Sequence, residues 1–397
     1  MPMLLPTKIV HIFYLCVSIW FAAFSVSGSA LAYETKAKAA FVLDLTSGTI
    51  LLAKNADTPL PPASMSKLMT LYVAFEFIKA GQLQLEEKLP VSSHAAQYGG
   101  STMFLDTTDR VSVEDLLKGI IVLSGNDACA VIAEALSPDG TEAGFARLLT
   151  QRAQQLGMTN STFRNSNGWP ATGHMMSTRD LALLAKHLIV DFPEFYPMFA
   201  EKEFAFDGRA PANSRNRNPL LGLGIGADGL KTGHTNEAGY GLTGSAVQGD
   251  RRIVFVISGL ASTEERAQEA EAIVNWAFRQ FSMKSFGKKG TVVAEAPVWN
   301  GAVSTVSLVL EDSIEALVPV LGNSAVNFEL EYKTPIPAPI LQDQELGTLI
   351  VNIEGLPEMN VPLLAQNAVP VGGFMTRIMT AAKTLLNTIA SGPEASL

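Results

Sequence analysis

The hydrophobic pattern of the chain changes type twice between its two ends, and the order of these changes limits the folds open to it. Two β-rich runs joined by a turn come first, at Ala40–Leu43 and Thr49–Leu52. Apolar residues then recur at helical spacing at 64–80, 113–123, 127–136, 144–156 and 178–190. Strand patterns return at 230–234, 239–246 and 252–259, and a helix is expected at 263–281. Strands on both sides of a helical stretch predict an α+β domain, with one antiparallel sheet flanked by helices.

A change of composition near residues 286–290 predicts a second domain. Short β-rich runs punctuated by proline and glycine follow at 303–310, 316–319, 326–332, 348–353 and 361–364. These runs predict a small all-β domain over 286–368, after a first domain over 33–285. The second domain holds no cluster of titratable residues, which favours a spacer or an interaction module.

The two ends of the chain indicate export. Lys8 precedes an apolar run from Ile9 to Val26, and small residues at Ala30 and Ala32 form a cleavage site, so residues 1–32 are expected to be a signal peptide. The alternative is an uncleaved membrane anchor. Residues 374–389 place their apolar side chains on one helical face, so 369–397 is expected to be a membrane-binding amphipathic helix and tail. The alternative is a helix that packs on a domain or on a second subunit.

The net charge and the cysteine content argue against nucleic-acid binding, an internal disulfide and a reactive thiol. The formal charge of −9 argues against nucleic-acid binding, which needs a basic face. After removal of the signal peptide Cys129 is the one remaining cysteine, so no internal disulfide can form. Its small, apolar neighbours predict a buried hydrophobic residue on a helix rather than a reactive thiol.

A serine and a lysine lie three residues apart at the start of the first predicted helix. Residues at this spacing share a helix face, so Lys67 can reach the Ser64 hydroxyl. A serine is a poor nucleophile unless a base removes its proton. Lysine can be that base where burial, a second cation or the helix N-terminus disfavours its charged form.

Two further motifs carry polar groups. Ser124-Gly125-Asn126 lies between two helical segments and offers a hydroxyl and an amide, although it could equally be a helix N-cap. Lys231-Thr232-Gly233 lies on a predicted strand, with Lys231 and Gly233 on one face. A cation and a hydroxyl there could bind a carboxylate, and an ordinary edge strand is the alternative.

The three motifs in this order form a set known from penicillin-binding proteins and class A β-lactamases. The chain resembles the low-molecular-mass penicillin-binding proteins of the D-alanyl-D-alanine carboxypeptidase type over nearly all of its mature length. The resemblance extends around the motifs to 124–128, 228–235 and 238–240. It implies a β-lactamase-like peptidase domain, a following β domain and a terminal amphipathic helix. The expected location is periplasmic, on the outer face of the cytoplasmic membrane.

The resemblance also implies a covalent mechanism. Ser64 would attack the carbonyl between the last two D-alanines of a peptidoglycan stem peptide and release D-alanine from an acyl-enzyme. β-Lactam antibiotics would acylate the same serine. Lys67 would be the general base, Ser124 would pass a proton to the leaving amine, and Asn126 would hold a substrate amide. No metal or other cofactor is implied.

The remaining residues implied by the resemblance bind the substrate. Lys231 and Thr232 would hold the terminal carboxylate, with Arg217 near it, although a surface role for Arg217 stays open. Gly233 would let the ligand approach the backbone. The backbone N–H groups of Ser64 and His234 would form the oxyanion hole.

Three other functions compete with this interpretation. A class A-like β-lactamase would need a Glu-x-x-Leu-Asn motif between Ser124 and Lys231, and none is present. A metallopeptidase is disfavoured because the histidines are scattered, without His-Glu-x-x-His. A non-catalytic protein that binds the cell wall on the same fold is disfavoured because all three motifs are intact.

Overall fold

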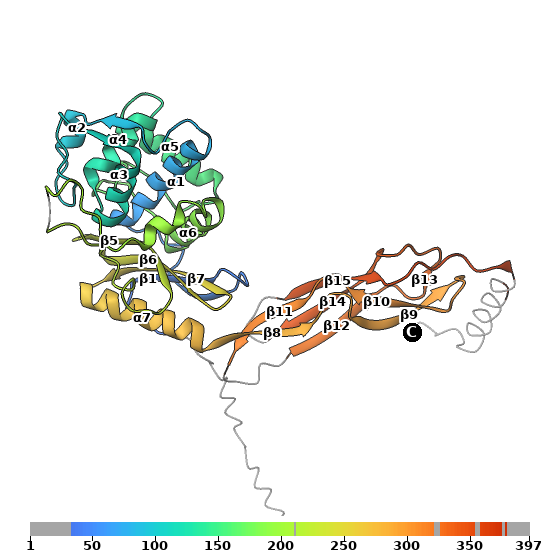
Figure 1. Ribbon diagram of the computed structural model, residues 1–397. Helices are drawn as coiled ribbons and strands as arrows, with labels where there is room; N and C mark the ends of the chain where they lie inside the picture. Colours follow the sequence, from blue (N-terminus) through green and yellow to red (C-terminus); the bar gives the residue numbers. More distant parts are fainter. Residues whose placement is uncertain (1–32, 210–211, 321–325, 354–357, 375–377, 379–397) are drawn as a thin grey trace, which may run out of the picture.

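The computed structural model describes residues 33–209, 212–320, 326–353, 358–374 and 378. The predicted signal peptide and nearly all of the predicted C-terminal helix lie outside these residues. Figure 1 shows a domain of helices and sheet, joined to an elongated β domain. Within the described residues, no helix is both long and apolar enough to cross a bilayer.

One antiparallel sheet organises the first domain, as predicted. Its five strands lie in the order β2-β1-β7-β6-β5. The N-terminal hairpin therefore joins strands from more than 180 residues later, with Ala39 opposite Ser258. The strands are β1 (Ala39–Asp44), β2 (Ile50–Lys54), β5 (Ala227–Thr235), β6 (Gly239–Gln248) and β7 (Arg251–Leu260).

Helices cover both faces of this sheet (Figure 1). One face carries α1 (Lys67–Lys79), α3 (Val113–Lys118), α4 (Asn126–Leu136), α5 (Glu142–Gln155) and α6 (Thr178–Asp191), with a large apolar core among them. The other face is covered by α7 (Thr263–Arg279), which packs in a separate apolar cluster. The smaller elements are η1 (Ala63–Ser66), β3 (Lys88–Pro90), α2 (Ser93–Ala96), β4 (Arg110–Ser112), η2 (Gly119–Leu123) and η3 (Tyr196–Ala200).

Local signals placed most helix starts correctly. Ser177 accepts a hydrogen bond from the Asp180 N–H, so the predicted start of α6 is confirmed as an N-cap. Two predicted helices differ in detail. The helix expected from Ser64 begins with a 3₁₀ turn. Ala63, which follows two prolines and opens this turn, has a positive φ of 48°. The helix expected over 113–123 is α-helical only to Lys118 and ends in the wider turn η2.

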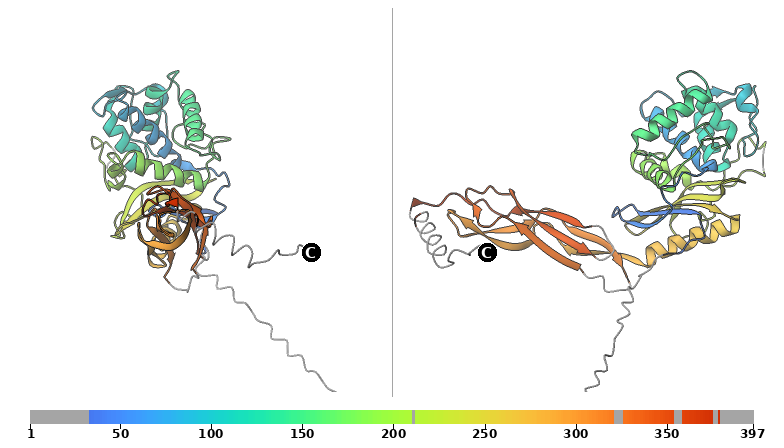
Figure 2. Two further views of the ribbon diagram at one scale, coloured as in Figure 1. Left: turned by 90° about the vertical axis from the view of Figure 1, so that its right-hand side faces the viewer. Right: turned by 180° about the vertical axis from the view of Figure 1, so that it is seen from behind.

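The second domain is all β, as predicted. A six-stranded sheet has the order β12-β14-β15-β10-β9-β13, and β8 pairs with β11. Figure 2 shows this domain extending away from the end of α7. The sequence patterns missed β8, β9 and β13. Phe281, the expected last residue of the preceding helix, begins β8 instead. The strands are β8 (Phe281–Gly287), β9 (Val292–Trp299), β10 (Thr305–Leu310), β11 (Ile314–Pro319), β12 (Val326–Tyr332), β13 (Ile336–Pro337), β14 (Glu345–Ile353) and β15 (Met359–Ala365).

Candidate active site

The serine and lysine of the first motif are in direct contact. Ser64 lies in the 3₁₀ turn η1, and Lys67 is the first residue of α1. The Lys67 Nζ lies 2.9 Å from the Ser64 Oγ. Helical spacing therefore brings the two groups together as the sequence predicted.

The amine of Lys67 is completely buried and held by two fixed acceptors. It donates to the Asn126 Oδ1 at 2.8 Å and to the Asn167 backbone oxygen at 2.7 Å. Both are carbonyl oxygens, which can only accept hydrogen bonds. Burial lowers the pKa of Lys67 to about 8, and the nearby Arg217 contributes to the shift. In the neutral amine, the two N–H groups bind these carbonyls, and the lone pair is left to face Ser64.

The second motif lies where η2 meets α4. Ser124 ends η2 with a left-handed backbone, at a φ of 63°, which is unusual for a residue other than glycine. Such strain persists where surrounding contacts fix it, and it is common at functional sites. Asn126 begins α4 and is held by hydrogen bonds from its backbone N–H to the Ser101 oxygen and from its Nδ2 to the Gly99 oxygen.

The third motif meets the second across the sheet edge. Lys231 lies on β5, and its Nζ donates to the Ser124 Oγ at 3.0 Å. The side chain is almost fully buried, and burial together with Lys67 and Arg217 lowers the pKa of Lys231 well below its ordinary value. Contacts Lys67–Asn126 and Lys231–Ser124 thus bring all three motifs into one site, although they are far apart in sequence.

An open cleft lies in front of Ser64, beside the residue that follows the third motif. A cavity of about 540 Å³ is lined by Ser64, Asn126 and His234. A Cβ on Gly233 would lie 2.9 Å from the Pro62 oxygen and 3.1 Å from the Met65 side chain. Only glycine therefore lets β5 pass this close to the turn that carries Ser64.

The other predicted binding residues lie around this cleft. Thr232 is buried on β5 and does not line the cavity. The exposed ring of His234 stacks on Tyr240, with centroids 3.9 Å apart. Arg217 donates to the Ser101 Oγ at 2.7 Å and to the Asn213 Oδ1 at 2.9 Å, so a network holds it beside the site.

Sequence reasoning missed the loop that follows α5. This loop supplies the Asn167 oxygen for Lys67 and is held by Thr70, whose hydroxyl donates to the Ser166 oxygen. Ser166 in turn donates through its N–H and its hydroxyl to the buried Glu142 carboxylate. Burial opposes ionisation of Glu142, but hydrogen bonds from Ser166, Tyr98 and His94 outweigh it and lower the pKa of its carboxyl. The dense run of turn-forming residues at 165–170 is the signal that could have identified this loop.

The site has the parts that acyl transfer requires. A hydroxyl contacts a buried amine of lowered pKa, and a second cation faces a second hydroxyl. Within the described residues, no group of three His, Cys, Asp or Glu side chains could hold a metal. Cys129 is free and buried on α4, as predicted.

Two family models match the chain in succession. The model of D-alanyl-D-alanine carboxypeptidases matches residues 25–262. The model of the C-terminal domain of penicillin-binding protein 5 matches residues 281–371, which contain all of the β strands from β8 to β15.

Individual proteins are similar over the same length. The chain is 37% identical to the D-alanyl-D-alanine carboxypeptidase DacC of Escherichia coli, over 90% of each chain. It is 33% identical to DacF of Bacillus subtilis, over 88% of this chain and 89% of that protein. The fold is similar to penicillin-binding protein 5 from Haemophilus influenzae, with a TM-score of 0.71 and 31% identity over 85% of this chain and 99% of that one. Penicillin-binding protein D2 of Listeria monocytogenes in an ampicillin-bound form is also similar, with a TM-score of 0.56 and 31% identity over 62% of this chain and 99% of that one.

Proposed function

Because this chain belongs to the D-alanyl-D-alanine carboxypeptidase family, we propose that it removes the terminal D-alanine from peptidoglycan stem peptides with Ser64 as its nucleophile. The chain is a serine-type peptidase and a low-molecular-mass penicillin-binding protein. The observation that supports Ser64 most directly is its 2.9 Å contact with the buried amine of Lys67.

In the proposed acylation step, the neutral amine of Lys67 takes the proton of the Ser64 hydroxyl. The Ser64 oxygen bonds to the carbonyl carbon between the last two D-alanines, and the negative charge that develops on the carbonyl oxygen faces the N–H groups of Ser64 and His234. The C–N bond then breaks, Ser124 passes a proton to the departing amine, and D-alanine leaves. Water afterwards hydrolyses the ester and frees Ser64. In a β-lactam the same attack would open the ring.

The proposed binding residues fit the two ends of the reacting dipeptide. Lys231, Thr232 and Arg217 would hold the terminal carboxylate, and Asn126 would hold the amide of the penultimate residue. The closeness of Lys67, Lys231 and Arg217 supports this assignment. Arg217 lowers the pKa of both lysines and Lys67 lowers that of Lys231, and a bound carboxylate offsets this repulsion. Gly233 lets β5 pass close to the turn that carries Ser64, which keeps the proposed carboxylate site next to the nucleophile.

The test is mass spectrometry of a stem pentapeptide incubated with purified protein. Loss of one alanine mass supports the proposal, and an unchanged pentapeptide contradicts it. A fluorescent penicillin separates the rival functions on the same fold. A lasting adduct on Ser64 supports the peptidase, rapid release of hydrolysed penicillin indicates a β-lactamase, and absence of labelling indicates a non-catalytic protein that binds the cell wall.

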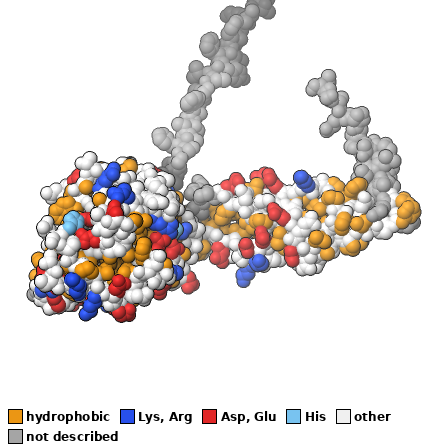
Figure 3. All heavy atoms as spheres, turned by 90° about the horizontal axis from the view of Figure 1, so that it is seen from above, with side chains coloured by type: hydrophobic (Ala, Val, Ile, Leu, Met, Phe, Trp, Pro, Cys, Tyr) orange, Lys and Arg blue, Asp and Glu red, His pale blue; other side chains and the backbone are white. Residues whose placement is uncertain are grey.

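We also propose that the chain is exported, with 1–32 as its signal peptide, 33–285 as the catalytic domain and 286–368 as the β domain. The division after residue 285 stays a prediction, and it falls inside β8. The tail over 369–397 would attach the protein to the outer face of the cytoplasmic membrane. Large exposed apolar side chains where that tail begins support this attachment, at Trp299, Val303, Leu341, Val371 and Phe374. Figure 3 shows hydrophobic side chains at the far end of the β domain.

Deleting residues 374–397 tests the attachment. The shortened protein should appear in the soluble fraction and hydrolyse soluble peptides at the full rate, because the active site lies in the other domain. Retention on membranes would contradict the membrane role of the tail. Lost activity would instead indicate that the tail packs on the protein.

A further inference from the structure

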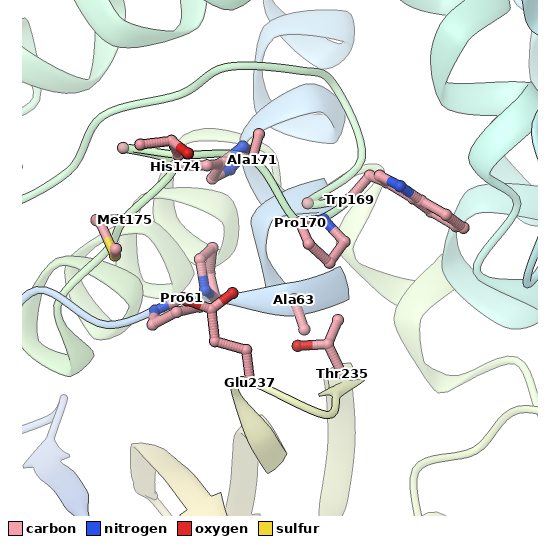
Figure 4. Close-up of a pocket in the computed structure, with 13 residues that line it drawn as sticks. Pro61, Ala63, Trp169, Pro170, Ala171, His174, Met175, Thr235 and Glu237 are labelled. Carbon is pink, nitrogen blue, oxygen red and sulfur yellow. The ribbon is translucent and has the colours of Figure 1, made fainter.

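A second cavity lies beside the catalytic cleft and shares part of its wall. It has a volume of about 330 Å³. Figure 4 shows Pro170 and Trp169 on one side of it and Ala63 and Pro61 on another. Both cavities share the same five wall residues, Gly168, Trp169, Pro170, Thr235 and Glu237. A ligand that leaves Ser64 along β5 therefore meets residues that also form the second cavity.

Glu237 gives this cavity its charge. Among the described residues it is the only carboxylate in the walls of either cavity, and it is exposed. It makes no hydrogen bond or ion pair with any residue that the structure describes. In Figure 4 its side chain rises from the loop after β5 toward Pro61.

The remaining walls are apolar or uncharged. Pro61, Pro62 and Pro170 supply apolar surface. No lysine or arginine from the described part of the chain lines the cavity. Burial together with Lys67 lowers the pKa of His174 to about 4, so this ring is neutral near pH 7. The cavity thus fits an alkyl chain that ends in a cationic group.

The spacing along β5 matches this cavity to one part of the substrate. Thr232 and Thr235 are three residues apart on the strand, which is roughly 10 Å. Two extended residues of a bound peptide span about 7 Å, so a peptide whose terminal carboxylate lies beside Thr232 places its third residue from the end near His234. A long side chain on that third residue can cover the remaining distance to Thr235 and the second cavity. The cleft is therefore cationic where the terminal carboxylate would bind and anionic where that side chain would end.

We infer that this cavity is a subsite for the amine-bearing side chain of a diamino acid at the third position of the stem peptide, and that Glu237 binds the amine. The inference rests on the proposed function. It makes Glu237 a specificity-determining residue, because the carboxylate meets the substrate three residues from its cleaved end. The opposite charges at the two ends of the cleft would fix the direction in which the peptide binds.

Two matched peptides test the inference with the full-length protein. One is Nα-acetyl-L-Lys-D-Ala-D-Ala, which has a free side-chain amine, and the other carries a second acetyl group on that amine. The wild-type kcat/KM should be about two- to five-fold higher for the free amine, which is the range of a partly exposed ion pair. Added salt should reduce this preference.

Substitutions then assign the preference to one carboxylate. Glu237→Gln should abolish the preference, and Glu237→Lys should reverse it. The matched control is Glu271→Gln on the exposed face of α7, which should leave the preference intact. A thermal melt at the wild-type temperature should show that all three variants are folded. Glu271→Gln should also be acylated by a penicillin without an amine at the wild-type rate.

The outcomes separate the subsite from the catalytic proposal. Hydrolysis of neither peptide by the wild-type protein would refute the proposed function and the subsite with it. Equal hydrolysis of both peptides would refute the subsite alone. A preference that survives in Glu237→Gln, or a variant that slows both peptides equally, would also overturn the role of Glu237.

Discussion

The two domains differ most in what they bury. Among the described residues, every buried polar or charged side chain lies between Thr35 and Glu269, and therefore in the first domain. These include both lysines of the site together with Asp127 and Glu142. The buried side chains of the β domain are all apolar, with Leu308, Val351 and Leu363 fully buried in its core.

This difference indicates which domain carries the chemistry. A buried charge is costly unless hydrogen bonds compensate for it, so a fold keeps such groups where function requires them. Lys67 retains three hydrogen-bonding partners, and Glu142 collects four donor atoms from the surrounding elements. The described residues of the β domain contain no buried polar network of this kind, which is consistent with a spacer.

The assignment of catalysis to the first domain would fail if D-alanine release survived the loss of Ser64. Ser64→Ala should reduce D-alanine release at least about a thousand-fold and abolish penicillin labelling, because among the described residues Ser64 carries the one hydroxyl that is hydrogen-bonded to the Lys67 amine. Release would be measured with the purified variant, and a thermal melt would show that it is folded. Release at the wild-type rate would end the assignment of the nucleophile.

The buried lysine pair predicts a particular pH dependence. Lys67 must be neutral to accept a proton, and its pKa is about 8, so acylation by a penicillin should slow about tenfold for each pH unit below 8. At pH 6 the rate should be roughly a hundredth of its plateau. The pKa of Lys231 is also lowered, and loss of its proton should reduce carboxylate binding on the alkaline side. A flat profile between pH 6 and pH 8 would contradict the role of Lys67.

Substitution of Lys231 should have the next largest effect on kcat/KM. Lys231→Ala removes the cation at the proposed carboxylate site and should lower kcat/KM about 10- to 100-fold, the usual range for a hydrogen bond to a charged group. A peptide with an amidated C-terminus is the control, because it lacks the carboxylate and should lose much less. Equal losses for both peptides would indicate that Lys231 acts on Ser124 rather than on the substrate.

A substitution in the core of the β domain should lower the stability of the protein and leave its activity unchanged. Leu363→Ala in its apolar core should cost about 2–5 kcal/mol of unfolding free energy, measured by denaturation, with kcat/KM unchanged. Leu68→Ala is the matched control, since it is equally buried but lies beside Lys67 in α1, and it should lower both stability and kcat/KM. A loss of activity in Leu363→Ala would show that the β domain supports the active site.

The sequence predicted the contacts that follow from local periodicity. Helical spacing placed Lys67 against Ser64, and strand alternation placed Lys231 and Gly233 on one face of β5. Hydroxyl N-caps marked helix starts such as Ser177. These predictions succeed because a period of 3.6 or 2 residues fixes which neighbouring side chains share a face.

Partners from distant parts of the chain were decided only by the tertiary structure. The Asn167 carbonyl that holds Lys67, the Glu142 carboxylate that holds its loop and the position of Glu237 beside the cleft all depend on how separate elements pack. A backbone carbonyl belongs to every residue and leaves no mark in a sequence pattern. Its distance from an amine a hundred residues away is set by the packing of helix, loop and sheet, which no local period encodes.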